Sequence, residues 1–135
     1  DILRFYPIYI NLKDMRMTFT NRQYGRRTIV EIPMKDLDSS IATLFKNHLL
    51  ELLESSPDDM VVIDLENVRF LDSTCLGALL TAFRQTGSKR KVALAAPQTA
   101  VLEVLNAARI TRVMAITRTL NEALCLLPEH WLADS

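Results

Sequence analysis

Hydrophobic and polar residues alternate strictly over residues 15–20, which is the pattern of a strand with one buried face. A second strand is predicted over residues 27–33, with Val30 and Ile32 on one face. Residues 21–26 lie between the two strands and are rich in turn formers. We therefore expect an antiparallel hairpin near the beginning of the chain.

A helical pattern follows a capping residue. Asp38 is placed to accept hydrogen bonds from the free backbone N–H groups of a first helical turn. Apolar residues then recur at helical spacing as far as position 53, and residues 55–59 are expected to end the helix. His48 lies on or beside this apolar stripe, where a packed side chain is expected rather than a ligand.

The rest of the chain alternates between strands and helices. Residues 60–65 form a short apolar run without alternation, which is typical of a strand buried on both faces of a parallel sheet. The elements expected after it are a helix at 74–86, a strand at 91–95, a helix that begins at Pro97, a strand near 112–117, and a last helix that follows the capping box at 119–122 and runs to about 127.

This order of elements, β-β-α-β-α-β-α-β-α, predicts an α/β fold. We expect an open, mostly parallel sheet of four to five strands, an antiparallel N-terminal edge, right-handed crossovers and about four helices. Residues 15–135 are predicted to form this single domain. Residues 1–14 are too apolar for a free tail, so an extra edge strand or a contact with another subunit is expected there.

Composition narrows the class of function. The 135 residues include 16 basic and 16 acidic side chains, so no net field favours nucleic acid or an anionic membrane. Neither Cys75 nor Cys125 belongs to a CxxC pair, which argues against structural zinc and favours reduced thiols in the cytoplasm. No apolar run approaches the roughly 20 residues of a membrane helix. We expect no cofactor, no metal and no membrane insertion.

The most informative segment brings a hydroxyl to a helix start. A buried strand passes through a short loop to Asp72, Ser73 and Thr74 at the beginning of a helix. Unpaired N–H groups and the helix dipole favour negative charge there, so a phosphate on Ser73 or Thr74 would be stabilised. The same pattern also fits a plain N-cap by either hydroxyl, with Asp72 adding favourable charge. Capping and phosphorylation are compatible.

This segment resembles the signature of the bacterial STAS-domain anti-sigma-factor antagonists, which reads Phe-hydrophobic-Asp-Ser-Ser/Thr-Gly-Leu-Gly. The matching residues are Phe70, Leu71, Asp72, Ser73, Thr74, Leu76 and Gly77. The resemblance implies a STAS-like fold and phosphorylation of Ser73 by a partner anti-sigma factor serine kinase. It implies that the surface that binds this partner includes Asp38, Asp72, Thr74, Cys75, Leu76 and Gly77.

Asp38 enters this set because residues 36–38 resemble the Gly-Glu-Leu-Asp segment of the family, which would bring Asp38 near Ser73. The chain departs from the family at two positions, since Lys35 and Cys75 stand where glycines are usual. We expect Cys75 to pack beneath the helix. A thiol near a helix N-terminus can also have a lowered pKa, which leaves a redox role as the alternative.

The resemblance implies a non-enzymatic protein-binding switch. Unphosphorylated protein would bind the anti-sigma kinase and free a sigma factor, with a homodimer as a further possibility. One alternative is a STAS module that regulates a transporter, such as a lipid-exporting ABC system, or serves a stress-sensing scaffold. Another is a small enzyme using Cys75 or Ser73. Against the enzyme, Ser73 lacks a Gly-x-Ser-x-Gly elbow, and no motif ties His48 or His130 to either nucleophile.

Overall fold

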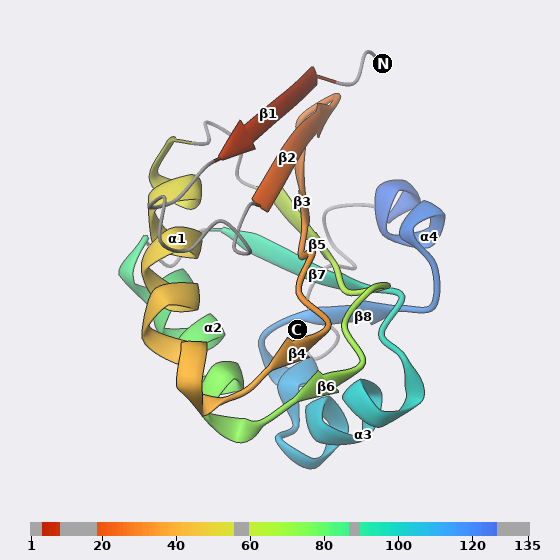
Figure 1. Ribbon diagram of the computed structural model, residues 1–135. Coiled ribbons are helices and arrows are strands. Elements are labelled where there is room, and N and C mark those ends of the chain that lie inside the picture. The colour runs from red at the N-terminus through yellow and green to blue at the C-terminus, as the bar shows by residue number, and fades with distance from the viewer. Residues whose placement is uncertain (1–3, 9–18, 56–59, 87–89, 127–135) are drawn as a thin grey trace.

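The computed structural model describes residues 4–8, 19–55, 60–86 and 90–126, and these form an α/β fold around one mixed sheet (Figure 1). The sheet has six strands in the order β1-β2-β3-β5-β7-β8. These strands are β1 (Arg4–Ile8), β2 (Phe19–Tyr24), β3 (Arg27–Glu31), β5 (Met60–Asp64), β7 (Lys91–Ala95) and β8 (Ala115–Thr117). β1, β2 and β3 pair antiparallel, and all later neighbours pair parallel. The predicted fold class is confirmed, and the sheet has one strand more than the predicted four to five because β1 pairs at its edge.

Within the described residues, four α-helices connect or follow the parallel strands. They are α1 (Ala42–Ser55), α2 (Ser73–Gln85), α3 (Thr99–Ala107) and α4 (Leu120–Cys125). The 3₁₀ turns η2 (Ser39–Ile41) and η3 (Ile110–Arg112) precede α1 and β8, respectively. A separate pair of short parallel strands, β4 (Asp36–Leu37) and β6 (Phe70–Leu71), lies outside the main sheet.

The helices cover the two faces of the sheet unequally. In the parallel part of the sheet the strands follow one another in chain order, so right-handed crossovers place their connecting helices on one face. The main core lies on that face and receives Val61 and Ile63 from β5 together with residues of α1, α2 and α3. Val62 points the other way, into a smaller cluster closed by Ala123 of α4. Figure 1 shows α1 and α2 on one side of the sheet and α4 on the other.

The N-terminal hairpin is confirmed, with a shorter turn than predicted. β2 continues through residues 21–24, which the pattern assigned to the loop, and only Gly25 and Arg26 form the turn. Gly25 has a φ of 61°, a left-handed conformation that glycine adopts without strain, so two residues suffice to reverse the chain. Residues 15–18 lie outside the described part of the chain. β1 pairs along the outer edge of β2, while a subunit contact of the first 14 residues stays a prediction.

Two predicted boundaries in the C-terminal half are wrong. α3 begins at Thr99 with Gln98 as its N-cap, so Pro97 precedes the helix instead of opening it. The left-handed φ of 58° at Ala96 makes the chain turn before Pro97 and delays the helix. The last strand begins only at Ala115, because residues 110–112 form η3. α2 spans Ser73–Gln85, one residue earlier at each end than the predicted 74–86, and α4 ends at Cys125, close to the predicted end at about 127. Residues 56–59, where the helix after Asp38 was expected to end, lie outside the described part of the chain.

The predicted capping box at the start of α4 is present with one change of partner. The Thr119 hydroxyl accepts a hydrogen bond from the N–H of Glu122 at 3.0 Å, as expected. The Glu122 carboxylate accepts from the N–H of Arg118 at 2.9 Å, one residue earlier than in the standard motif. Both ends of the box therefore satisfy free donors at the helix start.

Candidate functional site

The connection from β5 to α2 is held in place by buried side chains and backbone pairing. Leu65 and Val68 are buried below the loop that leaves β5. The carbonyl of Lys35 accepts hydrogen bonds from the N–H groups of Arg69 and Phe70 at 2.8 and 3.1 Å. These bonds, together with the β4–β6 pairing, fix residues 35–38 alongside residues 69–72. Two segments more than 30 residues apart in the sequence thus lie side by side.

Asp72 is the N-cap of α2. Its backbone is extended, with φ −97° and ψ 171°, and its Oδ1 accepts a hydrogen bond from the N–H of Cys75 at 2.9 Å. The expectation that Ser73 or Thr74 caps the helix is therefore wrong, since both residues already lie inside the first turn. Both are exposed, so their hydroxyls are open to solvent. Capping and the candidate modification site are on different residues.

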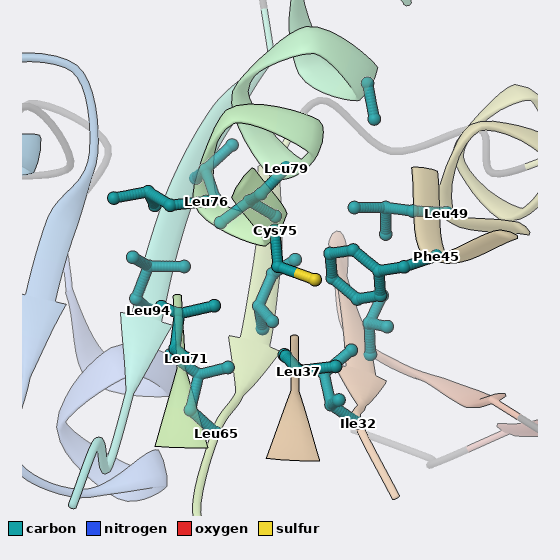
Figure 2. Packing of buried hydrophobic residues seen from close by; sticks show 14 of the residues in the cluster. Ile32, Leu37, Phe45, Leu49, Leu65, Leu71, Cys75, Leu76, Leu79 and Leu94 are labelled. Atoms are coloured by element: carbon teal, nitrogen blue, oxygen red, sulfur yellow. The ribbon is translucent and has the colours of Figure 1, made fainter. Parts of the chain in front are cut away.

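Cys75 packs beneath the helix start, as predicted. Its side chain is fully buried, and Figure 2 shows the sulfur directed towards the ring of Phe45 from α1. The Cys75 thiol donates a hydrogen bond to the carbonyl of Asp38 at 3.1 Å. Burial, followed by the nearby charges of Asp72 and Asp38, raises the pKa of the thiol to about 12. The alternative of a reactive thiol with a lowered pKa is wrong, because desolvation outweighs the helix terminus.

Asp38 is in contact with α2 through its backbone. Its Oδ1 accepts hydrogen bonds from the Ser40 N–H, at 2.9 Å, and from the Ser40 hydroxyl, so the predicted capping role is confirmed at η2. The Asp38 carbonyl accepts from Ile41 N–H and from the Cys75 thiol. The structure therefore brings the Asp38 carbonyl against Cys75 in the first turn of α2. Cys75 is two residues after Ser73 in the sequence.

The residues expected at the partner surface divide into two groups. Thr74 and Gly77 are exposed, and Asp38 and Asp72 are partly exposed. The side chains of Cys75 and Leu76 are in the main core and lie beneath these exposed residues. A direct contact of these two side chains with a partner is therefore not expected in this conformation.

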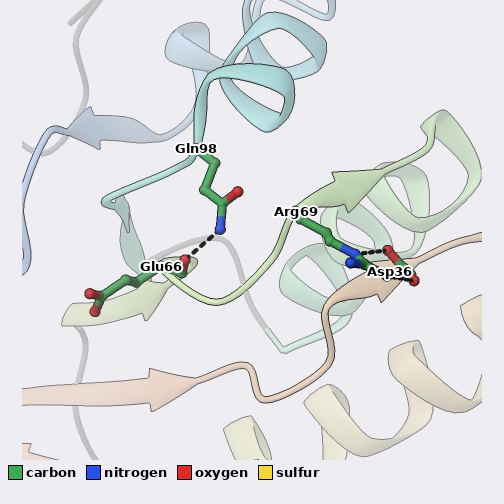
Figure 3. Close-up of polar contacts among 4 residues, drawn as sticks. All are labelled: Asp36, Glu66, Arg69 and Gln98. Atoms are coloured by element: carbon green, nitrogen blue, oxygen red, sulfur yellow. Dashed lines mark hydrogen bonds and ion pairs between the residues drawn. The ribbon is translucent and has the colours of Figure 1, made fainter.

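An exposed ion pair beside this loop was not predicted from the sequence pattern. Arg69 Nε lies 3.0 Å from Asp36 Oδ1, and Arg69 Nη2 lies 3.3 Å from Asp36 Oδ2 (Figure 3). The Arg69 hydrogen bond lowers the pKa of Asp36, and the same bond raises the pKa of Arg69. Phe70, the next residue, is 48% exposed. A strand of two residues is too short to show a hydrophobic period in the sequence. The contact between Asp36 and Arg69 is therefore seen only in the register of β4 with β6.

A second side-chain contact ties α3 to the same loop. Gln98 Nε2 donates to the carbonyl of Glu66 at 2.9 Å (Figure 3). The loop after β5 is thus bonded on one side to β4 and on the other to the N-cap of α3. Such bonds hold the exposed residues around Ser73 on a defined scaffold.

His48 is a packed residue of α1, as expected. The His48 side chain is buried in α1, with Nδ1 3.8 Å from Glu51 Oε1, which agrees with a packed residue. Within the described ranges, every helix is too short or too polar to span a bilayer.

Comparisons with known proteins concern the family and the fold. The family model for the STAS domain matches residues 18–123. The crystal structure of TM1081 from Thermotoga maritima, named as a candidate anti-sigma factor antagonist, has a TM-score of 0.68 at 25% identity and covers 78% of this chain and 91% of that chain. No curated protein matches this sequence significantly.

Two structures of the anti-sigma factor antagonist SpoIIAA show the fold at lower identity. The unphosphorylated form has a TM-score of 0.62 at 18% identity, over 78% of this chain and 92% of that chain. The phosphorylated form, from Bacillus, has a TM-score of 0.57 at 17% identity, over 78% and 96%. At these identities the likeness concerns the fold alone.

Proposed function

The chain belongs to the STAS domain family, and we propose that it is an anti-sigma-factor antagonist switched by phosphorylation of Ser73. In this proposal the protein is a non-enzymatic regulator in the bacterial cytoplasm. Its unphosphorylated form binds an anti-sigma factor serine kinase and so frees a sigma factor. The phosphorylated form releases the kinase.

One observation carries the proposal: an exposed Ser73 stands at the first position of α2 while the neighbouring Asp72 caps the helix. A kinase can reach an exposed hydroxyl without breaking the cap. The helix dipole and the free N–H groups of the first turn favour the added phosphate. Modification at this position is therefore compatible with an unchanged fold.

Similar proteins support the choice of partner and of switch. TM1081 is named as a candidate anti-sigma factor antagonist, and SpoIIAA is described in both an unphosphorylated and a phosphorylated form. We carry both properties to this chain as part of the proposal. The matched segment around Asp72 and Ser73 supports this step.

The proposed partner surface consists of the exposed parts of Asp38, Asp72, Thr74 and Gly77 around Ser73. A phosphate adds about −1.5 to −2 charges and three acceptor oxygens at pH 7. Placed among the carboxylates of Asp72 and Asp38, it adds repulsion and a desolvation cost to a close contact. A loss of about 2.7 kcal/mol of binding free energy lowers affinity about a hundredfold, which is enough to release a partner.

The direct test is incubation with a candidate anti-sigma factor serine kinase, ATP and Mg²⁺. Intact mass should rise by one phosphate, and peptide mapping should place it on Ser73. Ser73→Ala should remain unmodified, while Thr74→Ala, the matched control, should still accept phosphate. Phosphate on Thr74 alone would contradict the proposal, as would equal kinase binding by Ser73→Ala and Ser73→Asp. Equal binding would make a scaffold or transporter-regulating role the better explanation.

A further inference from the structure

Hydrogen bonds connect Asp38 and its neighbours to the start of α2. We call residues 36–41 the Asp38 segment. Its first part is fixed by backbone pairing, because the Asp72 N–H donates to the carbonyl of Leu37 at 3.0 Å. Beyond Leu37 the segment leaves β4 and turns into η2, where Cys75 supplies a further link to α2.

The Asp38 carbonyl accepts two hydrogen bonds. One comes from the backbone N–H of Ile41 at 3.1 Å and closes the 3₁₀ turn, and the other comes from the Cys75 thiol at 3.1 Å. Cys75 is fully buried, and Phe45 packs below it with 2% exposure. Water has no access to the sulfur, so a lost S–H donor would not be replaced there by solvent.

The thiol therefore joins elements that carry different parts of the proposed site. Cys75 is in the first turn of α2, which also bears Ser73, whereas Asp38 belongs to the partly exposed segment before α1. The signature that the segment around Ser73 resembles has Gly at the position of Cys75, and glycine has no side-chain donor. This chain thus has a tie that the signature residue could not make.

We propose that Cys75 is a positioning residue whose thiol holds the Asp38 segment against the start of α2, so that the kinase meets Ser73 and Asp38 in one fixed arrangement. This inference rests on the proposed function for its second half. Its first half, the tie itself, concerns the isolated protein. The two halves can therefore be tested separately.

The tie is tested by amide hydrogen exchange in three proteins: wild type, Cys75→Ala and Cys75→Ser. Alanine removes the donor, and serine keeps a donor of similar size. A neutral hydrogen bond contributes about 0.5–1.5 kcal/mol, so Cys75→Ala should speed exchange of the Ile41 amide about two- to tenfold. Cys75→Ser should retain most of the protection. The Glu122 amide, bonded to Thr119 in α4, is the internal control and should not change.

The functional half is tested with the same variants as substrates of the kinase. A loosened Asp38 segment weakens partner binding and leaves the Ser73 hydroxyl in place, so Cys75→Ala should raise KM about two- to tenfold with little change in kcat. Cys75→Ser should restore the wild-type KM. Unchanged exchange at Ile41 in Cys75→Ala would overturn the tie, and a serine variant identical to alanine would do the same. Faster exchange with an unchanged KM would overturn the second half.

A further measurement needs no substitution at Cys75. In a Cys125→Ser chain, Cys75 is the single thiol, and its labelling by a disulfide reagent reports opening of the contact above it. Asp38→Ala removes the carboxylate that accepts the hydrogen bond from the Ser40 N–H, so it should speed labelling of Cys75 severalfold. Asp38→Asn keeps an accepting oxygen and should keep the slow labelling rate. Equal rates in all three chains would overturn the tie. If no kinase modifies Ser73, the proposed function fails while exchange and labelling still decide the tie.

Discussion

The Asp72 carboxylate accepts a hydrogen bond from the backbone N–H of Cys75 at 2.9 Å, so the residue before Ser73, and not Ser73 itself, caps α2. This arrangement separates the helix cap from the proposed phosphorylation site. The Ser73 hydroxyl does not cap the helix, so phosphorylation there would leave the hydrogen bond of the cap intact. Stability and partner binding should therefore respond to different substitutions.

The first prediction concerns Asp72. Asp72→Ala removes the N-cap and should lower the free energy of unfolding by about 0.5–2 kcal/mol, measured by urea denaturation. Asp72→Asn keeps a capping oxygen and should stay within a few tenths of a kcal/mol of wild type. An alanine variant as stable as the asparagine variant would contradict the capping role.

The second prediction concerns Ser73. Because Ser73 is exposed at the first helical position, Ser73→Ala and Ser73→Asp should both stay within about 0.5 kcal/mol of wild-type stability. Ser73→Asp places a charge beside Asp72 at the proposed surface, so it should bind the kinase weakly, while Ser73→Ala should bind constitutively. Calorimetric titration with the kinase measures the difference. A Ser73→Asp chain that fails to fold would contradict the tolerance of negative charge at this helix start.

The layout of the fold could be predicted because long elements have a clear period. The helical spacing behind Asp38 and the continuous apolar run at 60–65 each extend over enough residues to define an element, observed as α1 and β5. β7, at Lys91–Ala95, coincides with the predicted strand. Boundaries failed where a single backbone angle decides them, as at Ala96, whose left-handed φ delays α3.

The sequence predicted which residues lie at the candidate site, but it predicted the structural role of each residue less well. A local motif identifies Asp72 and Ser73, yet which of them caps the helix depends on the backbone conformation at the strand end. The ion pair of Asp36 with Arg69 depends on the β4–β6 register between two-residue strands, and no sequence period encodes that. Burial of Cys75 follows from its place on the inner side of α2.

The third prediction is a pH dependence that arises from Cys75. Burial raises its pKa from the ordinary 9.0 to about 12, so the folded protein keeps the thiol proton where the unfolded chain has lost it. The folded state then binds more protons, and the stability that Cys75 contributes should fall as the pH rises from about 9 towards 12. The loss from one group is at most about 1.4 kcal/mol per pH unit.

Urea denaturation of wild type and Cys75→Ala between pH 7 and 10.5 measures this effect. Alanine has no proton to lose, so the stability difference between the two proteins isolates the thiol from the titration of other groups. We expect wild type to lose part of its advantage over Cys75→Ala above pH 9. A constant difference over this range would contradict the raised pKa.

The last prediction concerns Ala96, at the turn between β7 and α3. Its φ of 58° is left-handed, a conformation that costs an L-residue about 1–2 kcal/mol. The turn persists because its surroundings hold it: the Ala96 N–H donates to the carbonyl of Thr117 at 3.0 Å, and Gln98, two residues on, donates to Glu66. The strained turn is thus part of the structure that supports the loop before Ser73.

Glycine adopts this angle freely and keeps the N–H, but it costs about 0.5–1 kcal/mol of extra chain entropy on folding. Relief of strain outweighs that cost, so Ala96→Gly should raise the free energy of unfolding by up to about 1 kcal/mol. Ala107→Gly is the matched control: this exposed alanine lies in α3, where relief is absent, and the variant should lose about 0.5–1 kcal/mol. Because the hydrogen bonds of the turn are unchanged, Ala96→Gly should also leave kinase binding unaltered. A loss of stability equal to that of Ala107→Gly would show that the Ala96 backbone is unstrained and would contradict this prediction.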